Sequence, residues 1–178
     1  MKILTSFIFA IVFAFSFTSA VNLTAQSADQ KKKKPVYRKA RVLQASTAKK
    51  IVKIVEALEQ MDDEGNEAPD WNKAKEILTE LYNKRSEMKS YDRSVMWNYW
   101  GYIYFSEEKY DQAMNAYEML LNEPEATIPL RTSSLLTLAQ LNMVNEDYDR
   151  GIELILQWMD EVEKITAQSH YLLSLIHI

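Results

Sequence analysis

Apolar residues recur at intervals of three and four along most of this chain, which is the period of an amphipathic α-helix. The first clear stripe begins near Thr47 and contains Ile51, Ile54, Val55 and Leu58. Residues 62–69 then interrupt the period with acidic residues, a glycine and a proline, which predicts a loop. Asp70 follows at a position where its side chain can cap a second helix that contains Ala74, Ile77, Leu78 and Leu81.

The pattern of this second helix returns twice further along the chain. An aromatic residue three positions before a small residue occurs at Trp71–Ala74, at Tyr110–Ala113 and at Tyr148–Gly151. The two intervals between the three aromatic residues are nearly equal, and similarity at a fixed interval indicates a repeat architecture. We expect the small residue to let the second helix of each pair approach the first closely, and the aromatic residue to cover the turn between them.

The helices that precede these positions also match one another. Residues 92–106 carry Trp97, Trp100 and Gly101, and residues 129–144 carry Leu135, Leu138 and Ala139 at the equivalent places. Asn142 stands where the middle helix has Tyr104, and the first pair is recognisable only in its second helix. The sequence therefore predicts an all-α fold over residues 46–172, with about three antiparallel helix pairs and the start of a seventh helix at residues 166–172.

Residues 93–124 resemble the tetratricopeptide repeat. Trp97, Trp100, Gly101 and Tyr104, followed by Ala113, Tyr117 and Pro124, are similar to its pattern W-x-x-L-G-x-x-Y, A-x-x-x-F and P. The resemblance implies a TPR-type α-solenoid, in which each helix pair buries its apolar face only by stacking on its neighbours. It implies a scaffold that binds other molecules, and it does not imply catalysis.

The two ends of the chain differ from the array. Residues 1–20 have Lys2, an apolar stretch and small residues at a plausible cleavage point, which predicts a signal peptide; an uncleaved anchor is the alternative. Residues 21–45 read as a basic, disordered linker. Residues 173–178 resemble a translated sequencing adapter, so we interpret them as a non-native tail on a truncated gene product, against the alternative of a short natural C-terminus.

Charge changes sign along the chain. Residues 30–53 hold ten basic and no acidic residues, whereas residues 54–178 hold 24 acidic and ten basic ones. Residues 31–34 are four lysines without interleaved aromatic residues, which favours a solvated tether over contact with nucleic acid or anionic lipid. The absence of cysteine excludes disulfides and thiolate metal sites.

The residues that usually carry catalysis are scarce. The two histidines, His170 and His177, lie near the C-terminus without a metal-binding companion, and the three glycines are isolated from one another. The acidic loop lacks the ligand spacing of a calcium loop. We therefore expect a protein that is not an enzyme and that uses no metal and no cofactor.

The face of the first helices that is not needed for packing is the predicted binding groove. Its residues are Val95, Asn98, Tyr102 and Phe105, with Ser133, Leu136, Gln140 and Met143 one repeat later. Solenoids commonly hold peptides or helices along such a row. No lysine or arginine belongs to this set, which disfavours capture of a peptide carboxylate. The alternative is that these residues contact only water or a neighbouring subunit.

Two segments, Tyr99–Lys109 and Leu136–Tyr148, together with the leader and the basic segment, resemble a family of exported tetratricopeptide proteins from marine gammaproteobacteria. In that family the gene often accompanies a TonB-type energy-transduction cluster. The resemblance implies a periplasmic scaffold that binds a protein or peptide, with TonB-complex components as candidate partners and without stable membrane insertion after cleavage. An envelope-assembly factor for cell-wall or outer-membrane machinery is the alternative function.

Overall fold

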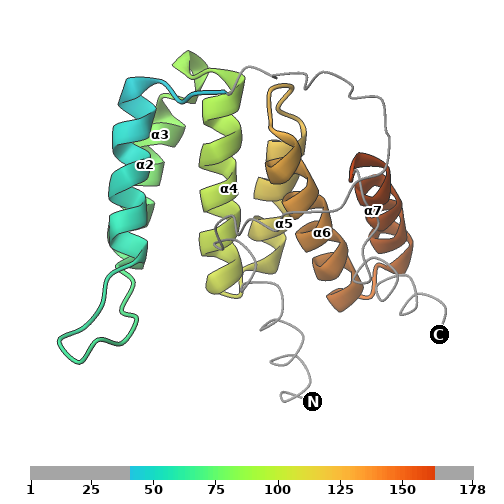
Figure 1. Ribbon diagram of the computed structural model, residues 1–178. Coiled ribbons are helices and arrows are strands. Elements are labelled where there is room, and N and C mark those ends of the chain that lie inside the picture. The colour runs from blue at the N-terminus through green and yellow to red at the C-terminus, as the bar shows by residue number, and fades with distance from the viewer. Residues whose placement is uncertain (1–40, 163–178) are drawn as a thin grey trace, which may run out of the picture. The chain divides into compact units, whose positions relative to one another are not determined.

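The computed structural model describes residues 41–162, and this part of the chain contains six α-helices and no β-strand (Figure 1). The helices are α2 (Ala45–Leu58), α3 (Trp71–Asn83), α4 (Ser90–Ser106), α5 (Tyr110–Leu121), α6 (Ile128–Val144) and α7 (Tyr148–Glu161), with a short 3-10 turn, η1 (Arg85–Glu87), between α3 and α4. The all-α prediction is therefore confirmed. The predicted signal peptide, most of the predicted linker, the helix expected after α7 and the predicted tail lie outside the described residues.

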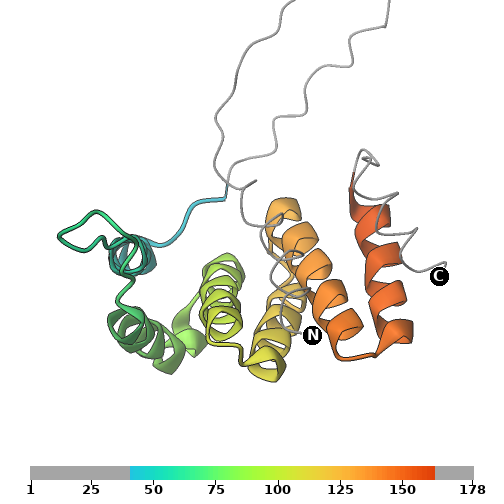
Figure 2. The ribbon, with the colours of Figure 1, turned by 90° about the horizontal axis from the view of Figure 1, so that it is seen from below.

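Consecutive helices pack as pairs, and neighbouring pairs pack on one another. The pairs are α2 with α3, α4 with α5, and α6 with α7. The second helix of each pair contacts the first helix of the next, and α4 also contacts α6 directly (Figures 1 and 2). The pairs thus follow one another in the order of the sequence.

The second and third pairs repeat with one constant offset. The first helices, α4 and α6, are both 17 residues long and begin at Ser90 and Ile128. The second helices, α5 and α7, begin at Tyr110 and Tyr148. The first helices are therefore offset along the sequence by the same interval as the two tyrosines. In the first pair α2 has only 14 residues, in keeping with its weaker match to the other first helices.

The buried apolar side chains form two clusters that overlap along the row of helices. The first core cluster joins the first and second pairs and includes Ile54, Leu78, Met96, Trp97, Trp100 and Leu120. The second core cluster joins the second and third pairs and includes Ala113, Tyr117, Leu135, Leu138, Leu154 and Trp158. Because burying a large apolar side chain contributes about 1.5–3 kcal/mol, the packing of neighbouring pairs on one another adds to the stability that the packing within each pair provides.

Side chains and backbone at the helix ends explain where the helices begin and turn. As predicted, Asp70 caps α3, since its Oδ1 accepts a hydrogen bond from the Lys73 backbone N–H at 2.8 Å. Asp147 caps α7 in the same way. The turns that follow α4 and α6 each place a glutamate in the left-handed region, Glu108 with φ 59° and Glu146 with φ 64°.

The small residues of the repeat pattern do allow close packing. Ala74 and Ala113 are fully buried, and a Cβ atom on Gly151 would lie 2.8 Å from Cε of Met143 on α6. One related prediction is wrong. Tyr148 does not cover its turn, because 57% of its surface is exposed, whereas Tyr110 at the equivalent position packs against the second core cluster, which includes side chains of the following pair.

Candidate partner-binding surface

The eight residues of the predicted groove lie on α4 and α6, which contact one another. Ser133 is exposed, and the other seven are half-buried. The constant offset between the two helices places Val95, Asn98, Tyr102 and Phe105 at positions equivalent to Ser133, Leu136, Gln140 and Met143. The structure thus leaves each of them at least partly accessible.

Several members of this set also contribute to packing. Phe105 lies against Tyr110, with ring centroids 6.0 Å apart, and Met143 lies against Gly151. Leu136 packs against the second core cluster. The part of the groove nearest the α4–α5 and α6–α7 turns therefore helps to hold the pairs together, which reduces the surface that it offers to a partner.

The two carboxamides of the set remain available for hydrogen bonding. Asn98 and Gln140 are half-buried, and neither side chain has a hydrogen-bond partner within residues 41–162. Both can therefore bond to water or to a backbone that approaches from outside.

A second half-buried surface lies between the first two pairs. We call it the α2–α4 band. Its members are the half-buried apolar residues of α2, α3 and α4 that pack against the first core cluster and not against the second, namely Val55, Leu58, Trp71, Val95, Tyr99 and Tyr102. Trp71 and Tyr102 lie with ring centroids 6.0 Å apart at an interplanar angle of 43°.

Sequence reasoning assigned only Val95 and Tyr102 of this band to a binding surface, and it placed Val55 and Leu58 in the apolar stripe of their helix. Trp71 was assigned to the turn, and Tyr99 lay one position away from the predicted groove face. Helical register identifies which residues share a face, but it does not give the separation of two helices that are not adjacent in sequence. The aromatic residues at positions 71, 99 and 102 were the available signal.

Burial is the main cause of the shifted pKa values of two tyrosines in the band, and a glutamate adds to each shift. Burial raises the pKa of the Tyr99 hydroxyl, and the charge of Glu59, at the end of α2, raises it further. Burial also raises the pKa of Tyr102; a hydrogen bond with Ser106 opposes this shift, and Glu67 in the loop after α2 adds to it. Both phenols therefore stay protonated at neutral pH and can donate hydrogen bonds.

The loop that carries Glu67 is held by its own side chains. The Asp62 carboxylate accepts hydrogen bonds from the backbone N–H groups of Glu64 and Asn66 at 2.9 and 2.8 Å. The hydrogen bonds from Asn66 are the main reason that the pKa of Asp62 lies below its usual value. At its end the loop returns to α2, where the Asp70 N–H bonds to the carbonyl of Ala57 at 2.8 Å. Within residues 41–162 no group of three or more histidine, cysteine or acidic side chains is arranged to hold a metal ion.

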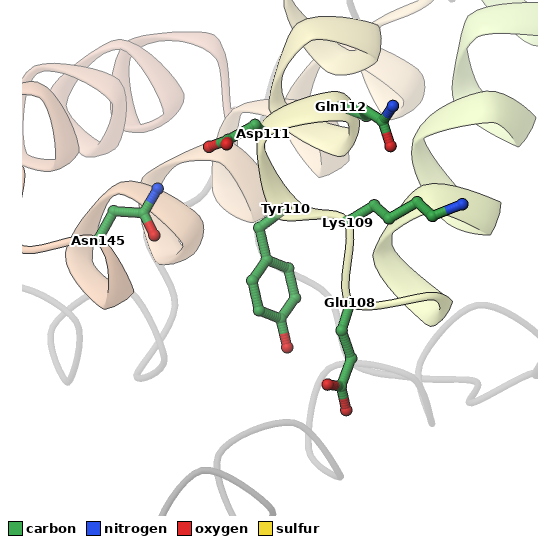
Figure 3. Close-up of a pocket in the computed structure, with 6 residues that line it drawn as sticks. All are labelled: Glu108, Lys109, Tyr110, Asp111, Gln112 and Asn145. Atoms are coloured by element: carbon green, nitrogen blue, oxygen red, sulfur yellow. The ribbon is translucent and has the colours of Figure 1, made fainter.

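A separate hollow of about 490 Å³ lies at the turns of the second and third pairs (Figure 3). It is lined by Glu108, Lys109, Tyr110, Asp111, Gln112 and Asn145. In Figure 3 these side chains point in different directions and do not converge on one point. Since a specific small-molecule site needs convergent polar groups, the hollow is a weaker candidate than the α2–α4 band.

An ion pair that the sequence reasoning missed recurs in all three pairs. A basic residue on the first helix binds a glutamate that lies on the second helix or directly after its end, at the same separation along the sequence each time. The pairs are Lys50–Glu80, Arg93–Glu123 and Arg131–Glu161. The two arginines are bidentate: Nε and Nη2 of Arg131, for example, bond to the Glu161 carboxylate at 2.9 and 2.7 Å. These residues fasten the two helices of each pair and do not form a ligand site.

Comparison with protein-family models, with curated proteins and with solved structures gave no match for this chain. In the part of the chain that the structure describes, no helix is long and apolar enough to cross a membrane.

Proposed function

We propose that residues 41–162 form part of a TPR-type α-solenoid that binds a segment of another protein. The single observation that carries this proposal is the α2–α4 band, a set of half-buried apolar and aromatic side chains whose helix α4 also carries the accessible carboxamide of Asn98. A surface that is partly apolar, with a few hydrogen-bonding groups, suits an extended peptide or an amphipathic helix. The constant offset between the second and third pairs supports the repeat architecture.

The proposed place of action is the periplasm of a bacterium. The apolar leader supports export, and the resemblance to exported tetratricopeptide proteins supports a role beside a TonB-type energy-transduction complex. In this role the protein is a scaffold and not an enzyme.

Capture of partners in the native cells tests the proposal. The full-length protein, tagged and expressed at its natural level, is crosslinked in living cells, and the captured proteins are identified by mass spectrometry. Recovery of TonB-complex components supports the accessory role, whereas recovery of cell-wall or outer-membrane assembly proteins replaces it with the envelope-assembly role. If no protein is enriched above an unrelated exported control, the scaffold proposal is wrong.

Two variants connect the captured partner to the proposed surface. Tyr102→Ala removes an aromatic member of the band, and Gln157→Ala on α7 is the matched control, because Gln157 is exposed and lies in the third pair. We expect the partner to be lost with the first variant and retained with the second, while circular dichroism shows both to be folded. Loss of the partner in both variants, or its retention in both, would show that binding does not depend on this surface.

A further inference from the structure

The four residues before α2 lie across the start of α4, and we call residues 41–44 the strap (Figure 1). Leu43 in the strap is half-buried and packs against the first core cluster. Nη1 of Arg41 lies 3.2 Å from Oε1 of Glu125, in the connection between α5 and α6. The strap therefore leads into the first pair but also contacts the second pair and the connection that follows it.

The last residue of the strap, Gln44, joins the beginning of α2 to the beginning of α4. Gln44 is the N-cap residue of α2, and its backbone N–H donates a hydrogen bond to Oδ1 of Asp92 at 3.0 Å. Its side-chain Oε1 accepts a longer hydrogen bond, at 3.4 Å, from the backbone N–H of Lys89, the N-cap residue of α4. Beyond this contact α2 packs mainly on α3, and α3 packs on α4. Gln44 is therefore a direct link between the two first helices that border the α2–α4 band.

Asp92 is a buried acid at a position where the repeat does not need one. It is the third residue of α4, whereas the third residue of α6 is Leu130, which packs against the first core cluster. Only 1% of Asp92 is exposed, and its second oxygen, Oδ2, has no hydrogen-bond partner within residues 41–162. A carboxylate is costly to bury unless it is hydrogen-bonded, although the first turn of a helix favours a negative charge. The N–H of Gln44 therefore satisfies a group that is unfavourable to bury without it.

We propose that the hydrogen bond between Gln44 and Asp92 holds the strap on α4 and thereby sets the separation of α2 and α4 along the α2–α4 band. Asp92 is then a positioning residue for the band. The inference rests on the proposed function only in taking the band as the binding surface. Release of the strap changes the first pair relative to α4 and leaves the packing of α4 on α6 as it is.

Two substitutions at one position isolate the hydrogen bond. Gln44 has a φ of −59°, which proline adopts, so Gln44→Pro removes the N–H without forcing a new backbone angle. Gln44→Ala is the matched control, because it also removes the side chain but keeps the N–H. Hydrogen exchange of the purified full-length protein, read by mass spectrometry, compares the helices. We expect the α2 amides to exchange about ten- to hundred-fold faster in the proline variant, with α6 and α7 unchanged, and the alanine variant to stay close to the parent.

Spin-label distances measure the separation of the helices directly. The chain contains no cysteine, so labels can be attached to introduced cysteines alone. Exposed Glu56 and Ser106 report the distance between α2 and α4, and Ser106 with exposed Val144 reports that between α4 and α6. We expect Gln44→Pro to lengthen or broaden the first distance and not the second. Asp92→Ala should do the same, whereas Asp92→Asn, whose Oδ1 still accepts a hydrogen bond, should keep the distance of the parent.

The contrary results are distinct from one another. Equal acceleration of exchange in all helices would show that the hydrogen bond contributes only to general stability, which overturns the inference. An unchanged distance between α2 and α4 in the proline variant, or a change of the same size in the alanine variant, would also overturn it. None of these results bears on whether a partner binds at the band. Conversely, retention of the partner by Tyr102→Ala would count against the proposed function while a lengthened distance still supported the strap.

Discussion

Gly101 and Gly151 both lie at close helix contacts in the repeat but tolerate an added methyl group differently. A Cβ atom on Gly101 would lie 2.6 Å from Cε1 and Cζ of Tyr117, whose ring is buried in the second core cluster. A Cβ atom on Gly151 would instead meet the terminal methyl of Met143, at the flexible end of a half-buried side chain. The first neighbour cannot move without disturbing the core, whereas the second can.

We therefore predict that Gly101→Ala lowers the free energy of unfolding by about 1–2 kcal/mol, since the overpacking cost exceeds the gain in helix propensity. Gly151→Ala should change it by less than about 0.5 kcal/mol in either direction, because displacement of the methionine is offset by the same gain. Urea denaturation of the two variants and the parent measures both effects. Equal destabilisation by the two substitutions would contradict this explanation.

The candidate surface shows at the residue scale what the sequence could and could not provide. Periodicity placed Asn98 and Gln140 on an accessible face, because register along one helix is a local property. It did not show that Phe105 and Met143 pack within their pairs, because those contacts involve Tyr110 and Gly151 on a second helix. It also missed Tyr99, which is half-buried and packs against the first core cluster.

At the scale of elements, the turns between the helices of the second and third pairs share one geometry. The N–H of Lys109 bonds to the carbonyl of Tyr104 at 2.8 Å, and the N–H of Asp147 bonds to the carbonyl of Asn142 at 2.9 Å. This pattern needs a left-handed residue, and the chain uses Glu108 and Glu146 where glycine is usual. A side chain in this conformation is unfavourable by about 1–2 kcal/mol.

Replacement of either glutamate by glycine should accordingly stabilise the protein. We expect Glu108→Gly and Glu146→Gly each to raise the free energy of unfolding by about 0.5–1 kcal/mol, because the relief of strain exceeds the greater flexibility of the unfolded chain. Glu118→Gly, at an exposed position inside α5, is the control and should destabilise by about 1 kcal/mol. Thermal unfolding of the three variants and the parent tests the prediction. Melting temperatures of the turn variants below that of the parent would refute it.

The ion pairs are a second property of the elements, and they make stability depend on pH. The hydrogen bonds from Arg131 are the main reason that the pKa of Glu161 lies below its ordinary value. A carboxylate whose pKa is lowered by folding stabilises the folded state above its unfolded pKa, near 4.3, and loses that contribution as the pH falls through the lower folded value. The stabilisation that the Glu161 carboxylate contributes is therefore fully present at neutral pH.

We predict that Glu161→Gln destabilises the protein by about 1–2 kcal/mol at pH 7, because it removes a charge-assisted bidentate pair that is mostly shielded from solvent. The difference from the parent should shrink as the pH falls below about 4. Glu153→Gln breaks an exposed pair on the same helix and should cost less than about 0.5 kcal/mol. Chemical denaturation across this pH range tests both statements, and a pH-independent cost at position 161 would show that charge is not responsible.

At the scale of the whole described array, the sequence predicted the order and spacing of the helices because these depend on local periodicity and on repetition. The start positions of α5 and α7 are offset as the aromatic residues indicated. The recurring ion pairs escaped notice because a constant separation between a basic residue and a glutamate has no meaning until the helices are known to be antiparallel neighbours. The overlap of the two core clusters likewise appears only when the pairs are packed together.

The central claim is that a partner protein binds on the first-helix side of this array, at the α2–α4 band. A photo-reactive amino acid placed at Asn98 in the full-length protein, compared with one at exposed Glu118 on α5, tests this claim most directly in living cells. We predict a specific crosslinked partner from position 98, reduced by the additional substitution Tyr102→Ala, and none from position 118. A partner crosslinked equally from both positions, or from position 118 alone, would contradict the account.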